Sequence, residues 1–170
     1  MSGETVPILL LADFNSALPP EGALLGLDLG TKTIGLAVSD VTRTVATPLA
    51  TIRRAGLGRD LDRLAEVIAQ RAIAGFVAGL PVEMNGREGR RCQAARQFAR
   101  DLTRRIERPL TFWDERLSTA AVERMLTSEA DLSRQRRGQV VDSVAAAYIL
   151  QGALDALAIQ AAAACPPPPE

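Results

Sequence analysis

The chain has 170 residues, 47% hydrophobic and 24% charged, and its 20 basic and 20 acidic side chains cancel to a net charge of zero. A chain of this length is expected to form one domain with a self-sufficient core. Zero net charge argues against a global basic field, so any nucleic-acid binding must come from a local patch. The sequence contains no histidine. This excludes Ser-His and Cys-His nucleophiles and histidine metal sites, and it leaves carboxylates to carry any chemistry.

Several features predict a cytoplasmic location. Glu4 occupies the region where a signal peptide carries a basic residue, so we expect no export signal. No apolar run approaches the roughly 18 residues of a membrane span, so no membrane association is expected. Cys92 and Cys165 lack the spacing of a zinc site or of a disulfide framework, which is typical of a protein in reducing surroundings.

Both ends of the chain are predicted to lie outside the domain. Residues 1–22 show no sustained hydrophobic period and end in LPPEG, so we expect a mobile N-terminal extension. The domain is expected to span residues 23–158. The remaining tail, 159–170, finishes in AAAACPPPPE, a composition typical of disordered or polyproline segments.

The first part of the predicted domain is a set of three antiparallel strands. Ala23–Asp40 is predicted to form a β-hairpin, with Asp28 just before its turn and a glycine on either side of it on the same face. Thr44–Ile52 follows as a third strand. Pro48 confines this strand to the edge of the sheet, because proline has no N–H to donate to a neighbouring strand.

The rest of the chain alternates helices and strands. Apolar residues at helical spacing predict a helix over 57–71, and the unalternating apolar run Ile73–Leu80 predicts a central parallel strand. Further elements are expected: a helix from the end of the loop 81–89 to about 105, a strand over 110–113, and helices over 119–126 and 139–158. The order predicts an α/β fold with a five-stranded mixed sheet, three strands antiparallel and then two parallel, flanked by helices.

Acidic residues follow the strands that should meet at one edge of this sheet. Asp28 lies near the end of the first strand, Asp114 and Glu115 follow the last strand, and Asp142 is expected in the first turn of the final helix. Because ligands bind outside the carboxyl ends of parallel strands, these carboxylates could converge there. Their mutual repulsion would require a counter-charge such as Mg²⁺. Two such ions could hydrolyse a phosphodiester. Each acid also has a structural alternative, such as a turn hydrogen bond for Asp28 or a favourable helix dipole for Asp142.

Four motifs and the segment that follows them resemble a known family. They are GLDLGTKTIGLAVSD (26–40), ATPL (46–49), GLPVEMNGREG (79–89) and DERLST (114–119), followed by DSVAAAYILQ (142–151). In this order they resemble the YqgF/RuvX family of Holliday-junction-resolvase-like proteins, which have an RNase H-like fold. The resemblance covers about residues 23–157.

The resemblance implies a metal-dependent nuclease that uses Mg²⁺ or Mn²⁺ and matures the 5′ end of precursor 16S ribosomal RNA in ribosome biogenesis. Its partners would be structured RNA or branched DNA, and the small ribosomal subunit. By position, the catalytic and metal-binding acids would be Asp28, Glu115 and Asp142, with Asp114 in reserve, because strand alternation alone does not choose between Asp114 and Glu115. The chain departs from the family in having Ser143 where lysine is frequent. It also lacks an acid at the end of its central strand.

Nucleic-acid contacts are predicted from basic residues near the predicted site. Arg87 lies in the loop that opens onto a helix N-terminus, where free N–H groups favour anions. A solvated helix face is the preferred interpretation of Arg96, Arg100 and Arg104. The complete set of predicted contacts is Lys32, Arg87, Arg116, Arg136 and Arg137.

Other functions stay open at this stage. Activity could be that of a Holliday-junction resolvase. The motif GLDLGTK also resembles the first phosphate loop of the actin, Hsp70 and sugar-kinase group, which would indicate an ATP-binding protein. That function needs a second lobe to close the cleft, for which this length leaves no room. A third possibility is a non-catalytic RNA or ribosome-assembly module in which arginines contact phosphates and the acids are structural.

Overall fold

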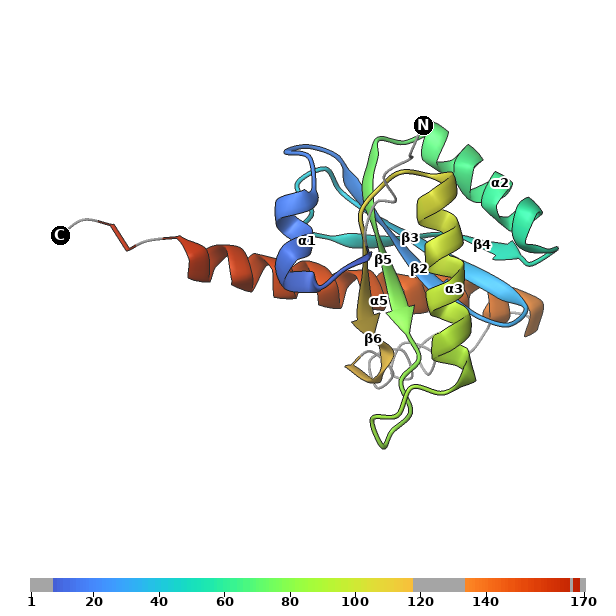
Figure 1. The fold of residues 1–170 in the computed structure, drawn as a ribbon. Helices are drawn as coiled ribbons and strands as arrows, with labels where there is room; N and C mark the ends of the chain where they lie inside the picture. Colours follow the sequence, from blue (N-terminus) through green and yellow to red (C-terminus); the bar gives the residue numbers. More distant parts are fainter. Residues whose placement is uncertain (1–7, 118–133, 166, 169–170) are drawn as a thin grey trace.

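The computed structural model describes residues 8–117, 134–165 and 167–168, and these form one mixed sheet between two layers of helices (Figure 1). In the described part of the chain the sheet has six strands in the order β1-β6-β5-β2-β3-β4. Their bounds are Ile8–Leu9 (β1), Ala23–Leu29 (β2), Thr33–Ser39 (β3), Ala46–Arg53 (β4), Ile73–Leu80 (β5) and Leu110–Asp114 (β6). The mixed sheet that was predicted is confirmed, with β1 as an additional sixth strand.

The antiparallel and parallel halves of the sheet meet at β2. This strand pairs antiparallel with β3 on one side and parallel with β5 on the other. All eight residues of β5 are buried, as its unalternating apolar sequence predicts for a strand covered on both faces. At the opposite end of the sheet, β4 is the edge strand. Its Pro48 lies opposite Ala37, next to a register irregularity in β3.

Helices cover both faces of the sheet (Figure 1). Their bounds are Leu11–Ala17 (α1), Leu57–Ala69 (α2), Arg90–Arg105 (α3) and Arg134–Ala164 (α5), and a 3-10 helix, η1, spans Glu115–Leu117. One hydrophobic cluster joins Leu27 and Phe76 of the sheet to Phe98 of α3. The second joins Val77 to Phe14 of α1 and Leu150 of α5. The sheet therefore has an α2/α3 face and an α1/α5 face.

The N-terminal segment differs from the prediction of a mobile extension. Its residues 8 and 9 form β1, which pairs parallel with β6, and α1 buries Phe14 completely. The prediction that the domain begins at residue 23 is therefore wrong for residues 8–22. The two-residue strand and the seven-residue helix are too short to produce a hydrophobic period.

The last helix is longer at both ends than predicted. It begins at Arg134 instead of 139, and it continues to Ala164, into the tail that was predicted to be disordered. Asp142 therefore does not lie in the first turn of the helix. The predicted helix at 119–126 falls outside the described residues.

One segment of α5 is long and apolar enough to cross a membrane by length and composition. Within the described residues this is Val140–Ala164, whose best 18-residue window has a mean hydropathy of 1.4. Counting uninterrupted apolar runs missed this segment because polar residues such as Gln151 and Asp155 interrupt it. The finding gives weak support for a membrane span, since a core helix passes the same test, and α5 packs Leu150 and Leu154 into the core.

Candidate active site

The position of Asp28 depends on a close approach of α5 to the sheet. Asp28 lies opposite Gly35 in the β2–β3 register. A Cβ atom added at Gly35 would lie 2.0 Å from the backbone oxygen of Asp142. Similarly, a Cβ at Gly26 would lie 2.8 Å from Cβ of Leu150. Helix α5 therefore packs directly against the sheet at Gly26 and Gly35, the two glycines next to Asp28. This close packing brings Asp142 next to Asp28.

Asp142 is held by a side chain from the β2–β3 hairpin. The hydroxyl Oγ1 of Thr33 donates a hydrogen bond of 2.6 Å to Oδ2 of Asp142. The helix-dipole explanation does not apply to this acid, because α5 begins eight residues earlier and the dipole effect falls off within the first turn.

Glu115, and not Asp114, turns toward Asp28. Along β6, Phe112 packs into the core of the α2/α3 face and Trp113 into that of the α1/α5 face. Alternation therefore directs Asp114 to the α2/α3 face. There it accepts hydrogen bonds from Arg116, the shortest from Nη2 at 2.6 Å, and this arginine lowers the pKa of Asp114.

The side chain of Glu115 lies across the end of β5. A Cβ at Gly79 would lie 2.6 Å from Oε1 of Glu115. The absence of an acid from the end of the central strand therefore has a physical reason, since the glutamate occupies that space. Glu115 also makes a side-chain hydrogen bond with Asp28.

The acids of this site hold their protons more strongly than free carboxyl groups. Burial, followed by repulsion from Asp142, raises the pKa of Asp28 to about 6. Burial and the charge of Asp28 raise the pKa of Glu115 to about 7. Arg91, in the first turn of α3, acts in the opposite direction on both groups. At neutral pH the site therefore holds closely spaced negative charge that a single arginine offsets only in part.

These residues fit a small, hard cation. All the donor atoms are carboxylate oxygens, which Mg²⁺ and Mn²⁺ prefer, and Mg²⁺ is commonly held by one or two carboxylates together with substrate phosphate. Within the described residues, however, no group of three or more acidic or cysteine side chains is arranged closely enough to hold a metal ion by itself. The Asp28–Glu115 pair is thus the part that could hold a cation, and Asp142 adjoins it on α5.

Comparison with known proteins identifies the family. The family model described as "RuvX: Holliday junction resolvase" matches residues 22–156. The chain belongs to the RuvX family. A relative from Rhodobacter capsulatus is 62% identical over 146 residues, 86% of this chain and 91% of the relative. Another from Rhodospirillum rubrum is 59% identical over 152 residues, 89% of this chain and 94% of the relative. Both relatives carry the name "Putative pre-16S rRNA nuclease".

The fold also resembles a solved structure. RuvC of T. thermophilus, in complex with a Holliday junction substrate, superposes with a TM-score of 0.50 at 18% identity. The match covers 79% of this chain and 94% of that one. At this identity the likeness concerns the fold alone, and it confirms the predicted RNase H-like class for this RuvX-family protein.

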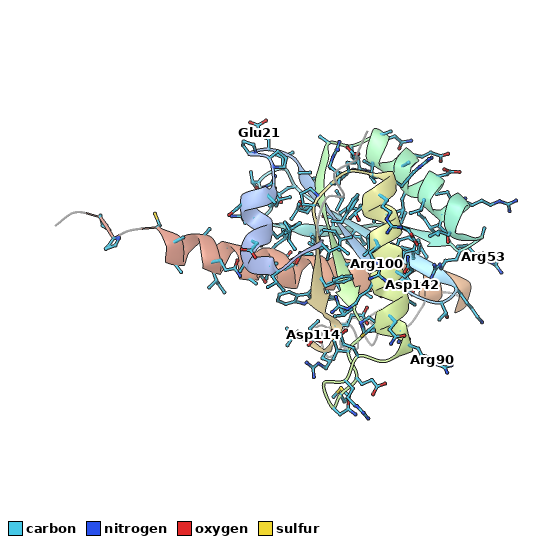
Figure 2. All side chains as sticks on the ribbon, in the orientation of Figure 1. Glu21, Arg53, Arg90, Arg100, Asp114 and Asp142 are labelled. Carbon is cyan, nitrogen blue, oxygen red and sulfur yellow. The ribbon has the colours of Figure 1, made fainter. Side chains whose placement is uncertain are left out.

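A cleft of about 530 Å³ opens beside Glu115 of the RuvX-family site. Its walls include Arg90 and Arg91 at the N-terminus of α3 and Arg116 of η1, together with Pro81, Val82, Glu83, Met84 and Gly89. Figure 2 shows Arg90 at the end of α3 where the loop 81–89 enters the helix. Sequence reasoning missed Arg91. Its place in the first helical turn after the central strand is the signal that could have found it, because such turns border the ligand-binding edge.

The predicted nucleic-acid contacts have different surroundings. Lys32 is exposed in the β2–β3 turn, and Arg87 is exposed in the loop before α3, where its backbone N–H donates to Oδ1 of Asn85 at 2.9 Å. Arg116 is already paired with Asp114. The side chains of Arg136 and Arg137 lie outside the described residues. The side chains of Lys32 and Arg87 are therefore accessible, and their contacts with nucleic acid stay a prediction.

Proposed function

We propose that this protein is a divalent-metal-dependent nuclease that cuts a phosphodiester bond of structured RNA, with precursor 16S ribosomal RNA as its substrate. The observation that carries the proposal is the half-buried Asp28–Glu115 pair, next to Asp142, at the sheet edge where α/β proteins bind ligands. The names of the relatives support the choice of substrate, and they support a role in ribosome biogenesis at the small subunit. A cytoplasmic location is part of the same proposal.

In this proposal, Asp28 and Glu115 would hold Mg²⁺ or Mn²⁺, with Asp142 as the adjoining third acid. Such a cation, when bound, activates water and stabilises the developing charge on the leaving oxygen. Thr33 fixes the carboxylate of Asp142 through its 2.6 Å hydrogen bond. The close packing of α5 on Gly35 fixes the backbone of the same residue. The chain thus contributes a rigid, partly desolvated set of oxygens.

Binding of the substrate would use basic groups around the acids. Arg91 is close enough to offset the charge of Asp28 and Glu115, so it could contact a phosphate that approaches the pair. Lys32 and Arg87 are accessible on the two neighbouring loops. These three residues are proposed as phosphate contacts.

A second candidate substrate is branched DNA, which the description of the family model favours. ATP binding of the actin type has less support, since the described residues form a single lobe and that site lies between two lobes. A non-catalytic role would leave the raised pKa values of two half-buried acids without a purpose.

The deciding experiment incubates the purified chain with a 5′-extended 16S precursor RNA and, separately, with a four-way DNA junction. Each substrate is tested with EDTA, Mg²⁺ or Mn²⁺, and Asp28→Asn is the control for contaminating nucleases. We expect cleavage of the RNA that requires both the metal and Asp28. Cleavage of the junction alone would assign the resolvase activity. Binding without cleavage under every condition would contradict the nuclease.

A further inference from the structure

A second cleft lies on the same edge of the sheet, away from the acids. It measures about 550 Å³ and is formed where β4 ends and α2 begins. Its walls are Arg53, Arg54, Ala55, Arg59, Asp62 and Arg63. Arg53 is opposite Thr33 in the β3–β4 register, so β4 ends beside the turn that follows Asp28. In Figure 2, Arg53 and Asp142 lie right of centre and Arg90 lies below them, whereas Glu21 lies at the upper left.

The wall of this cleft is held in place by a buried acid. Asp60 is 1% exposed and accepts hydrogen bonds from the backbone N–H of Ala55 at 2.9 Å and from Nε of Arg54 at 3.3 Å. The same guanidinium donates through Nη1 to the backbone oxygen of Gly30 at 2.9 Å and lies over the ring of Phe98. Arg54 is thus a structural arginine that links the second cleft to Gly30, at the start of the hairpin turn that follows Asp28.

The other arginines of the cleft are not used in this way. Arg53, Arg59 and Arg63 are exposed, and none of them forms a salt bridge with any residue that the structure describes. The one acid in the wall, Asp62, is bound to Arg105 at 2.8 Å. Arg59 and Arg63 are four residues apart, so they lie on the same side of α2 and repel each other. A chain of zero net charge therefore concentrates three uncompensated guanidinium groups at one hollow of its surface.

We propose that this cleft binds the phosphodiester backbone of the nucleic-acid substrate at a distance from the bond that is cut. Guanidinium groups bind phosphate oxygens through paired hydrogen bonds, and phosphate contacts fix the register of a nucleic acid without reading its sequence. The rigid link from Arg54 to Gly30 fixes the position of the cleft relative to Asp28. The identity of the ligand rests on the proposed nuclease function, whereas the site itself rests on the arginine cluster.

The test compares charge removal in the cleft with the same removal elsewhere. The variant Arg59→Ala/Arg63→Ala takes two positive charges from the cleft. The control Arg71→Ala/Arg104→Ala takes two from exposed arginines that do not line the cleft, one after α2 and one near the end of α3, where Arg104 has only a 4.0 Å contact with Asp101. The full-length proteins are titrated with a 5′-extended 16S precursor RNA over a series of salt concentrations, and thermal melts verify that each variant is folded.

We expect Arg59→Ala/Arg63→Ala to bind roughly tenfold more weakly and to reduce the slope of log K against log salt by about 2, one for each lost phosphate contact. Lysines at both positions should restore most of the slope, because the charge is kept. The control should bind like the wild type. Equal affinity and slope for the cleft variant and the wild type, or an equal loss in the control, would overturn the inference.

The outcomes separate this inference from the proposed function. If the wild type binds RNA but cuts nothing, and Arg59→Ala/Arg63→Ala loses affinity and salt slope as expected, the nuclease assignment fails and the cleft stands. If the RNA is cut and Arg59→Ala/Arg63→Ala binds and cuts it like the wild type, the cleft inference fails and the nuclease stands. If the wild type binds no nucleic acid even at low salt, both fail.

Discussion

The side chains of Glu115 and Asp28 share a hydrogen bond at the end of β5, where Glu115 lies in the space that Gly79 leaves open. The bond lowers the pKa of Asp28 and raises that of Glu115, so the two carboxyl groups can share one proton. Two carboxylates that lie close enough to share a proton need only a small separation to share a cation. The pair is therefore already arranged to hold a positive charge between its two carboxylates. A divalent cation could take the place of the shared proton.

Replacement of Asp28 by asparagine should abolish cleavage and leave the fold intact. The amide keeps the shape of the carboxylate and removes one charge from a half-buried cluster of acids, so the metal-free variant should be as stable as the wild type or slightly more stable. Cleavage assays with Mn²⁺ and thermal melts with EDTA measure both effects. A variant that cuts normally, or that melts several degrees lower, would falsify the catalytic role of Asp28.

Mn²⁺ or Mg²⁺ should raise the melting temperature of the wild type. A ligand that binds only the folded state at about 100 times its Kd stabilises it by about 2.7 kcal/mol. For a chain of this size that corresponds to roughly 5–10 °C. The variant Asp28→Asn/Glu115→Gln should lose most of this increase. Superimposable melting curves with and without millimolar Mn²⁺ would show that the pair does not bind the ion.

Metal-free protein should become less stable as the pH rises from about 4 to about 7. Asp28 and Glu115 have pKa values of about 6 and about 7 in the folded state, above those of exposed carboxyl groups. The folded state therefore binds more protons in this window, so the stability present below the unfolded pKa values is lost as the pH rises through the folded ones.

Urea unfolding in EDTA at several pH values measures this dependence. The matched variant Asp28→Asn/Glu115→Gln should show a flatter profile between pH 4 and 7. Asp40 provides an internal contrast, since its hydrogen bonds from Thr42, Val45 and Thr44 lower its pKa to about 2. Its contribution is lost only as the pH falls below about 4. An identical slope in the variant and the wild type between pH 4 and 7 would contradict the prediction.

Replacement of Gly35 by alanine should disrupt the contact between α5 and the sheet. The added Cβ would lie 2.0 Å from the backbone oxygen of Asp142, which cannot move without the helix. The cost should be about 3 kcal/mol or more, at the upper end of overpacking effects. Gly58 is the control, because nothing lies within 4 Å of its Cβ position and alanine there should stabilise α2 by about 0.5 kcal/mol. Equal unfolding free energies for the two variants would show that α5 adapts.

The parts of the fold that the sequence predicts well are those with a strong local pattern. The strand β5 has the predicted bounds, Ile73–Leu80, because an apolar run between a helix and a loop leaves little choice. In contrast, β1 has two residues and its partner Leu110 lies about a hundred positions away. No local pattern records such a pairing. The early start of α5 was missed for a related reason, since its first turns are polar and give no apolar period.

The acids of the site could be found from the sequence, but their arrangement could not. The choice between Asp114 and Glu115 depends on which side chains of β6 face α3, and that becomes known only when Phe112 and Trp113 are placed. Arg91 was overlooked because its effect on the acids is electrostatic and acts through space.

The position of α5 after all the strands of the sheet has a consequence during synthesis. The ribosome releases the polypeptide from its N-terminus, so the strands β2 to β6 leave the exit tunnel before the helix that carries Asp142. Until α5 has emerged, Val77 and Leu24 have no helix α5 to cover them, and Asp28 and Glu115 lack their third acid. The candidate site is therefore incomplete on a nascent chain until α5 has left the tunnel and packed on the sheet.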